Sequence, residues 1–118
     1  MANRLSELLL AATIACTIGV SALPAAAEDI AAPDHARQRE ILRLLKQDCS
    51  ACHGMRLTGG LGPALTPDAL RERPPASLVA TIVYGRPGTA MPPWRPFLSE
   101  AEAEWLVARI RQGATDAP

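Results

Sequence analysis

Cys49-Ser50-Ala51-Cys52-His53 is the stretch that decides the fold of this 118-residue chain. The spacing C-x-x-C-H is typical of a c-type haem attachment site. Each of the two thiols can add to one vinyl group of a haem, and the histidine after the second thiol can offer a ring nitrogen to the iron. The sequence therefore predicts one haem c, bound covalently through Cys49 and Cys52, with His53 as the proximal metal ligand.

Three other interpretations of the cysteine pair explain less of the sequence. A thioredoxin-like redox pair requires a strand-helix-strand context, which the downstream sequence lacks. A structural zinc site requires four ligands, whereas the pentad supplies at most three and the only other histidine, His35, lies upstream. A simple disulfide would account for both cysteines, but it leaves the adjacent histidine unexplained.

The first 27 residues have the layout of a secretory signal peptide. Arg4 precedes an uncharged, largely apolar run over residues 8–23, and Pro24 is followed by three alanines that supply an A-x-A cleavage site. The run is shorter than the roughly 20 residues that a membrane-spanning helix needs. We therefore expect cleavage after Ala27, a periplasmic location, and no membrane association of the remaining chain.

Residues 28–118 have the length of a single small domain. Cys16 lies in the apolar run and would leave with the signal, so Cys49 and Cys52 are the only cysteines that remain. Twelve basic and twelve acidic residues give the whole chain no net charge at pH 7. This balance argues against a nucleic-acid partner and against strong long-range steering of an oppositely charged partner. We expect a monomer.

Local start and stop signals predict an all-α domain. The helices that we expect, bounded by N-cap residues, prolines and glycines, cover residues of about 34–47, 66–71, 74–84 and 99–113. The last has the clearest start, a capping box of Ser99 and Glu102. Its inward-facing residues are Trp105, Leu106 and Ile110. Glycine- and proline-rich loops separate the helices, and no stretch is typical of a strand.

The iron of such a haem has a second axial position, for which Met91 is the best candidate. Met91 lies between residues 88 and 94 in a proline-rich loop, where a thioether can be held at a fixed distance from the iron. His/Met ligation raises the reduction potential and suits electron transfer. Met91 could instead be a gap-filling core residue. Met55 is too close to His53 to reach the opposite haem face, and His35 precedes the attachment helix.

The order of these motifs resembles that of a class I cytochrome c over residues 28–118. Residues 59–65 and 85–94 are similar to the small periplasmic monohaem cytochromes c encoded with the cytochrome cd-type nitrite reductase of denitrifying bacteria. The resemblance implies three to five helices with long loops around one haem. It also implies that the carbonyl of Pro63 accepts a hydrogen bond from the second ring nitrogen of His53, which would fix the imidazole.

Two positions depart from the family pattern. Many members carry a glycine eight residues before the first cysteine and an aromatic residue four before it, where this chain has Ile41 and Leu45. In the family the first and last helices cross at this place. We therefore expect the crossing against Trp105 to be wider or repacked.

Four residues near the ligand loop can donate hydrogen bonds to the haem propionates. These candidates are Tyr84, Arg86, Trp94 and Arg95.

The expected function is electron transfer rather than catalysis. Iron with two protein ligands cannot easily bind a substrate, which leaves one-electron exchange. The resemblance suggests redox protein partners, with the cytochrome cd nitrite reductase as electron acceptor. An accessory redox role in the maturation of that enzyme's d-type haem is an alternative that the sequence does not separate from the first. An open-site haem sensor or enzyme would require that Met91 does not ligate.

Overall fold

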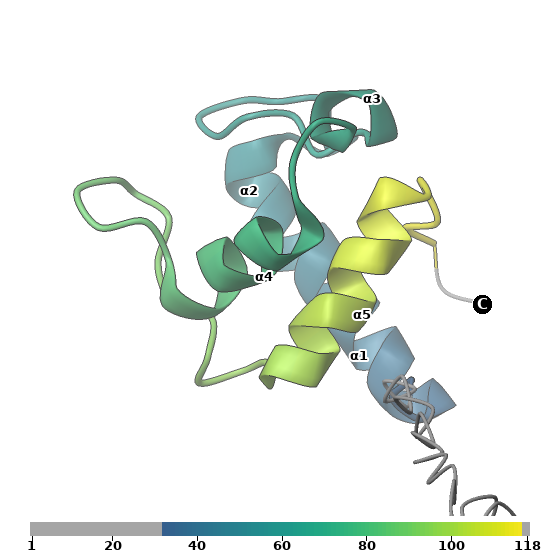
Figure 1. The fold of residues 1–118 in the computed structure, drawn as a ribbon. Helices are drawn as coiled ribbons and strands as arrows, with labels where there is room; N and C mark the ends of the chain where they lie inside the picture. The colour runs from purple at the N-terminus through teal and green to yellow at the C-terminus, as the bar shows by residue number, and fades with distance from the viewer. Residues whose placement is uncertain (1–31, 117–118) are drawn as a thin grey trace, which may run out of the picture.

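The computed structural model describes residues 32–116, in which helical segments are joined by long irregular loops (Figure 1). The segments are α1 His35–Leu44, η1 Leu45–Cys49, α2 Ser50–His53, α3 Pro67–Leu70, α4 Pro75–Tyr84 and α5 Glu100–Arg111. This part of the chain contains no strand, which confirms the prediction of an all-α fold. The predicted signal peptide lies outside the described residues. Within them, no helix combines the length and the apolar character needed to cross a bilayer.

The first three segments form one continuous helical rod. The carboxylate of Asp34 caps its start, accepting a hydrogen bond of 2.9 Å from the backbone N–H of Arg37. The sequence predicted an end near Gln47, but the rod continues to His53 through the wide π-helical turn of η1. In this turn the backbone N–H of Ser50 donates to the carbonyl of Leu45, five residues earlier. The predicted end was wrong, and all three residues of the attachment motif stand on helical backbone.

The remaining helix boundaries follow the sequence signals. The side chain of Thr66 caps α3, and α4 begins at Pro75. Ser99 and Glu102 form both hydrogen bonds of a capping box at the start of α5, at 3.2 and 2.8 Å. These caps satisfy backbone N–H groups that have no partner inside their own helix.

Helix α5 buries two faces against different neighbours. Leu106 and Ile110 pack with Ile41, Leu42 and Leu45 in one core cluster. The second cluster lies between α4 and α5 and contains Val79, Val83, Ala103 and Val107. Trp105, expected inside, is only half-buried. The sequence analysis did not predict the second buried face, because Ala103 and Val107 are small and add little to the apolar periodicity of the helix.

The crossing of α1 and α5 accommodates both departures from the family pattern. Ile41 and Leu45 are 1% and 0% exposed. An ion pair also ties the two helices, because Arg37 donates to both carboxylate oxygens of Glu102, at 2.6 and 3.1 Å. This guanidinium is the main reason that the pKa of Glu102 falls to about 2.

Candidate haem-binding site

His53 ends α2, and its side chain is 8% exposed. Its Nδ1 lies 2.7 Å from the carbonyl oxygen of Pro63, the distance of a good hydrogen bond. A carbonyl can only accept, so Nδ1 carries the proton and Nε2 keeps its lone pair. The ring is thus oriented with one nitrogen free to bind a metal, as the sequence resemblance implies.

The loop over residues 54–65 folds back against the attachment helix. The backbone N–H of Gly62 donates to the carbonyl of Cys52 at 2.8 Å, and that of Gly59 donates to the carbonyl of His53 at 2.9 Å. A Cβ atom at Gly62 would lie 2.8 Å from Cε1 and 2.9 Å from Nδ1 of His53. Only glycine leaves room for the imidazole here. Sequence reasoning treated Gly62 as a turn residue and missed this contact, for which its place before Pro63 is the only signal.

Cys49 and Cys52 are free thiols, each half-buried and separated by one helical turn. Cys49 packs against the core cluster that contains Leu45. Its burial, with a smaller contribution from the charge of Asp48, raises the pKa of the Cys49 thiol to about 11. The folded chain therefore holds Cys49 as a neutral sulfur facing apolar surroundings.

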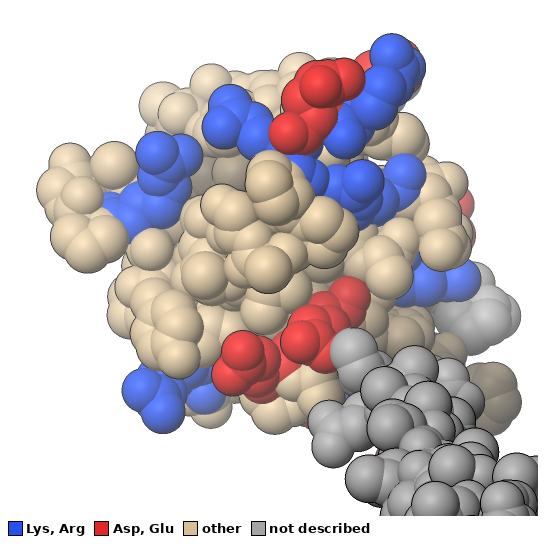
Figure 2. Space-filling model, viewed as in Figure 1, with Lys and Arg blue, Asp and Glu red and all other residues tan. Residues whose placement is uncertain are grey.

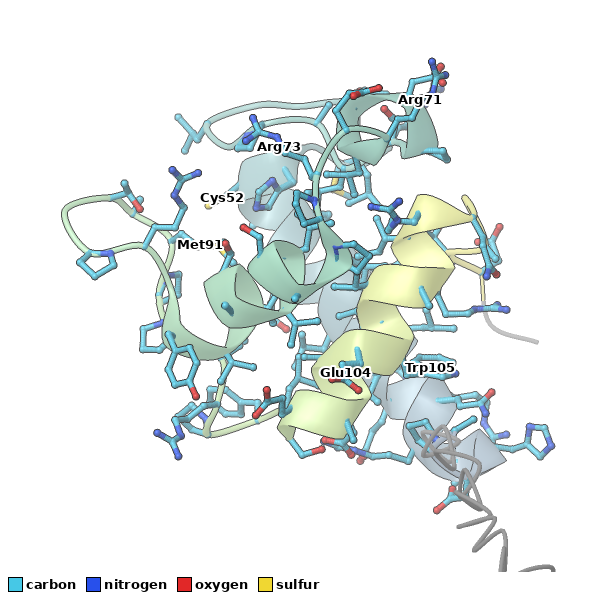
Figure 3. All side chains as sticks on the ribbon, in the orientation of Figure 1. Cys52, Arg71, Arg73, Met91, Glu104 and Trp105 are labelled. Atoms are coloured by element: carbon cyan, nitrogen blue, oxygen red, sulfur yellow. The ribbon has the colours of Figure 1, made fainter. Side chains whose placement is uncertain are left out.

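The loop with Met91 is fastened to the end of α4. The backbone N–H of Arg86 donates to the carbonyl of Met91 at 3.1 Å, and that of Trp94 donates to the carbonyl of Ile82 at 2.9 Å. Gly85, with φ of +70°, allows the return, because a Cβ there would lie 2.8 Å from the carbonyl oxygen of Met91. Met91 is half-buried and lies on the same side of α4 as Cys52 in the view of Figure 3.

The other two candidate ligands are poorly placed. His35 is exposed at the far end of the rod, and 18 residues of helix separate it from His53 by about 27 Å at 1.5 Å per residue. The side chain of Met55 is 84% exposed. Neither is positioned to compete with Met91.

The four propionate candidates differ in their surroundings. The guanidinium of Arg95 lies 5.8 Å from the ring centre of Tyr84, a cation–π arrangement. The indole of Trp94 is half-buried beside Phe97, at 5.9 Å between ring centres. Arg86 is exposed. The hydrogen bonds of these four side chains to the haem propionates stay a prediction.

The residues in place fit a haem c. The donor set comprises two thiols at the motif spacing, an imidazole with a free Nε2, and a thioether in a loop that backbone hydrogen bonds hold to α4. Four half-buried apolar side chains pack against the same core cluster as Cys49: Leu65, Leu78, Ile82 and Trp94. Apolar side chains of this kind can pack against the flat, largely apolar haem, and Gly62 leaves room for the imidazole of His53.

Comparisons with known proteins agree with this chemistry. A family model described as cytochrome C oxidase, cbb3-type, subunit III matches residues 36–109. Cytochrome c55X of Pseudomonas aeruginosa is 56% identical, over 90% of this chain and 83% of that protein. The solved structure of the c-type cytochrome NirC is 59% identical with a TM-score of 0.69, over 73% of this chain and all of that one. These matches confirm the cytochrome c fold.

A third relative has another role in its name. Dihydro-heme d1 dehydrogenase of Pseudomonas aeruginosa is 40% identical over 64% of this chain, but only 15% of that protein is covered. The similarity is thus confined to a small part of the enzyme. Because the c55X match spans nearly the whole of both proteins, the chain belongs to the cytochrome c55X family of c-type cytochromes.

Proposed function

We propose that this chain is a periplasmic electron-transfer protein whose single haem c is attached through Cys49 and Cys52 and ligated by His53 and Met91. The bound haem would supply one-electron exchange at its iron. The observation that carries the proposal is the fixation of both candidate ligands by backbone hydrogen bonds. His53 is held by the Pro63 carbonyl at 2.7 Å, and the Met91 carbonyl is bound by the Arg86 N–H at 3.1 Å.

Fixed ligands serve electron transfer in a direct way. Electron transfer is easier when the iron ligands move little as the charge of the iron changes. A loop that is held by backbone hydrogen bonds resists such movement. The thioether of Met91 would also favour reduced iron and so raise the reduction potential of the bound haem. With His53 and Met91 both bound to the iron, a substrate would find no vacant site there.

The test is the spectrum of the oxidised protein, together with Met91→Ala. The wild type should show the weak far-red band of Fe–S(Met) ligation and bind carbon monoxide poorly when reduced. Met91→Ala should lose the band and bind carbon monoxide tightly. Met55→Ala is the matched control, because that side chain is 84% exposed and should change neither property. A wild type without the band would favour the open-site sensor or enzyme.

The location and the redox partners are further parts of the proposal. The apolar run before Pro24 supports export, and mass spectrometry of the protein from the periplasm should give a mature chain beginning at Glu28. The family and the similarity to cytochromes encoded with nitrite reductase support that cytochrome cd enzyme as electron acceptor. A mature chain that retains residues 1–27 would overturn the proposed export.

An accessory role in haem d1 maturation is the second candidate. It is favoured by the similarity to dihydro-heme d1 dehydrogenase over 64% of this chain, a relative whose name places it in the chemistry of that haem. A deletion strain separates the two roles. Inactive nitrite reductase that lacks its d-type haem supports maturation, whereas complete enzyme starved of electrons supports the carrier.

A further inference from the structure

The segment that carries Cys52 and Met91 is more basic than the neutral chain suggests. Residues 50–98 contain five arginines but only two carboxylates, Asp68 and Glu72. Arg71 is paired with Asp68. Four other arginines of this segment therefore outnumber its one other carboxylate, Glu72.

Two of these arginines lie beside the candidate haem site. In the view of Figure 3, Arg73 and Met91 lie on either side of Cys52. Arg86 is joined to Met91 by its backbone hydrogen bond of 3.1 Å. Both side chains are exposed and neither has an ion pair among residues 32–116. We call Arg73 and Arg86 the arginine pair.

Most of the other acidic side chains lie outside this segment, although Asp48, whose charge acts on Cys49, directly precedes it. Glu100, Glu102 and Glu104 occupy the first turns of α5, where α5 meets the start of α1 through the Arg37–Glu102 ion pair. Figure 2 shows basic side chains over much of the upper part of the face that it views, with acidic groups among them, acidic side chains below its centre, and further basic side chains at the lower left and right. The chain is thus neutral as a whole, but residues 50–98 carry an excess of arginine over carboxylate.

Local charge matters more than net charge for docking. At physiological ionic strength the screening length is about 8 Å, so an approaching partner experiences the charges near its contact point. The same segment also offers an apolar group near His53: Leu61 is 91% exposed, and it precedes Gly62, whose Cα borders the His53 ring. An apolar centre with a charged rim suits a small, short-lived interface.

We propose that the arginine pair and Leu61 form the docking surface for a redox protein that presents carboxylates around its own redox centre. The proposal rests on the proposed function, since it assumes that electrons leave at this surface. Two guanidinium groups can each bind a carboxylate through paired hydrogen bonds. The complementary charges would orient the partner and speed its association, although the chain carries no net charge.

The experiment measures oxidation of the haem-loaded, reduced protein by two small probes of opposite charge. Ferricyanide and tris(phenanthroline)cobalt(III) each accept one electron from the haem iron. At low ionic strength, R73Q/R86Q should slow oxidation by ferricyanide about five-fold, because two cations that attract the trianion are lost. The same variant should speed oxidation by the cobalt cation.

The opposite response of the two probes excludes a simple change in potential, which would move both rates in the same direction. The matched control is R39Q/R43Q, which removes two exposed arginines from α1. Helical geometry places these about 21 and 15 Å from His53. This control should change both rates by less than two-fold. Equal effects of the two double variants, or parallel effects on both probes, would overturn the proposal.

Two macromolecular probes identify the class of partner. Poly-L-glutamate should slow oxidation of the wild type by ferricyanide, because it covers the arginine pair and repels the trianion, and it should have a much smaller effect on R73Q/R86Q. If instead the wild type cosediments with phosphatidylglycerol vesicles at 0.1 M salt in an arginine-dependent way, the surface binds membranes and the protein partner is wrong. The far-red band, read on the same samples, reports Met91 ligation separately, so failure of the docking surface is distinguishable from failure of the electron carrier.

Discussion

Gly62→Ala is expected to displace the His53 ring and so to change both the stability and the potential of the protein. The added Cβ would lie 2.8 Å from Cε1 of His53, whereas ordinary contact begins at 3.4 Å. The ring or the loop must therefore yield by roughly 0.6 Å, which a close-packed site resists. Such overpacking costs about 1–3 kcal/mol.

The same displacement stretches the hydrogen bond between His53 and Pro63, now 2.7 Å long. Its weakening adds about 1 kcal/mol, so the total loss of stability is about 2–4 kcal/mol. For a domain of this size, 1 kcal/mol shifts Tm by about 4–8 °C. We therefore expect a fall in Tm of at least about 8 °C by circular dichroism.

The potential should change as well, and its direction follows from the ring's hydrogen bond. The Pro63 carbonyl makes the imidazole a more basic ligand, which favours oxidised iron. When this bond is stretched, the oxidised state loses support and the potential rises. A redox titration followed by absorbance measures the change.

Gly88→Ala is the matched control for this experiment. A Cβ at Gly88 meets no atom within 4 Å, although its φ of +78° makes alanine strained. This control should lose about 1 kcal/mol through backbone strain and keep the wild-type potential. If Gly62→Ala melts within 2 °C or so of the wild type and keeps its potential, the contact with His53 does not constrain the ring and the reasoning is refuted.

Three further predictions concern the frame around the site. Glu102 has a native pKa of about 2 against an ordinary value of 4.5, so its stabilisation is complete above pH 4.5 and is lost as the pH falls toward 2. Because the side chain of Arg37 is 34% exposed, solvent screening reduces the stabilisation that corresponds to this pKa shift to about 1–2 kcal/mol. The test is E102Q, which keeps the oxygen that caps α5, in urea titrations at pH 7 and pH 3. Its free energy of unfolding should be closer to that of the wild type at pH 3 than at pH 7. Gly85→Ala should weaken the far-red band and destabilise the fold more than Gly88→Ala does. The reason is that a Cβ at Gly85 would lie 2.7 Å from backbone atoms of Pro92 and Pro93. An unchanged band would contradict the role given to Gly85. Leu45→Ala should cost about 2–5 kcal/mol in denaturant unfolding, because Leu45 is fully buried, and a loss below 1 kcal/mol would show that this position tolerates a cavity.

Features encoded by adjacent residues could be predicted from the sequence. Asp34, Thr66 and Ser99 each cap a helix by accepting a backbone hydrogen bond within three residues. Pro75 and Gly85 bound α4 because one lacks a backbone N–H and the other tolerates positive φ. The attachment motif likewise needs only one turn of helix to bring its residues together.

Features that depend on distant contacts could not be predicted. The π-helical turn of η1 is accompanied by a hydrogen bond from the Ser50 hydroxyl to the Lys46 carbonyl at 2.5 Å, in a segment whose Leu45 is buried by other helices. The preferences of single residues for the α-helix do not indicate where a π-helical turn will form. The Arg37–Glu102 pair joins residues 65 positions apart, and the proximity of Gly62 to His53 exists only after the loop has closed.

Net charge is the sequence feature that misled most, because summation discards position. Residues 50–98 contain five arginines but only two of the twelve carboxylates, so the neutral total hides a local excess of positive charge.

The position of these charges bears on the choice between the two proposed roles. A carrier must bind its donor and its acceptor in turn, so its docking surface must release each partner quickly. Two guanidinium groups and an exposed Leu61 would orient a partner without a large buried area, and weak interfaces of this kind dissociate fast. A maturation factor that remains with one enzyme would instead benefit from a broad apolar interface. The arginine pair therefore favours the carrier role, and a tight complex with one enzyme that is insensitive to salt would reverse that preference.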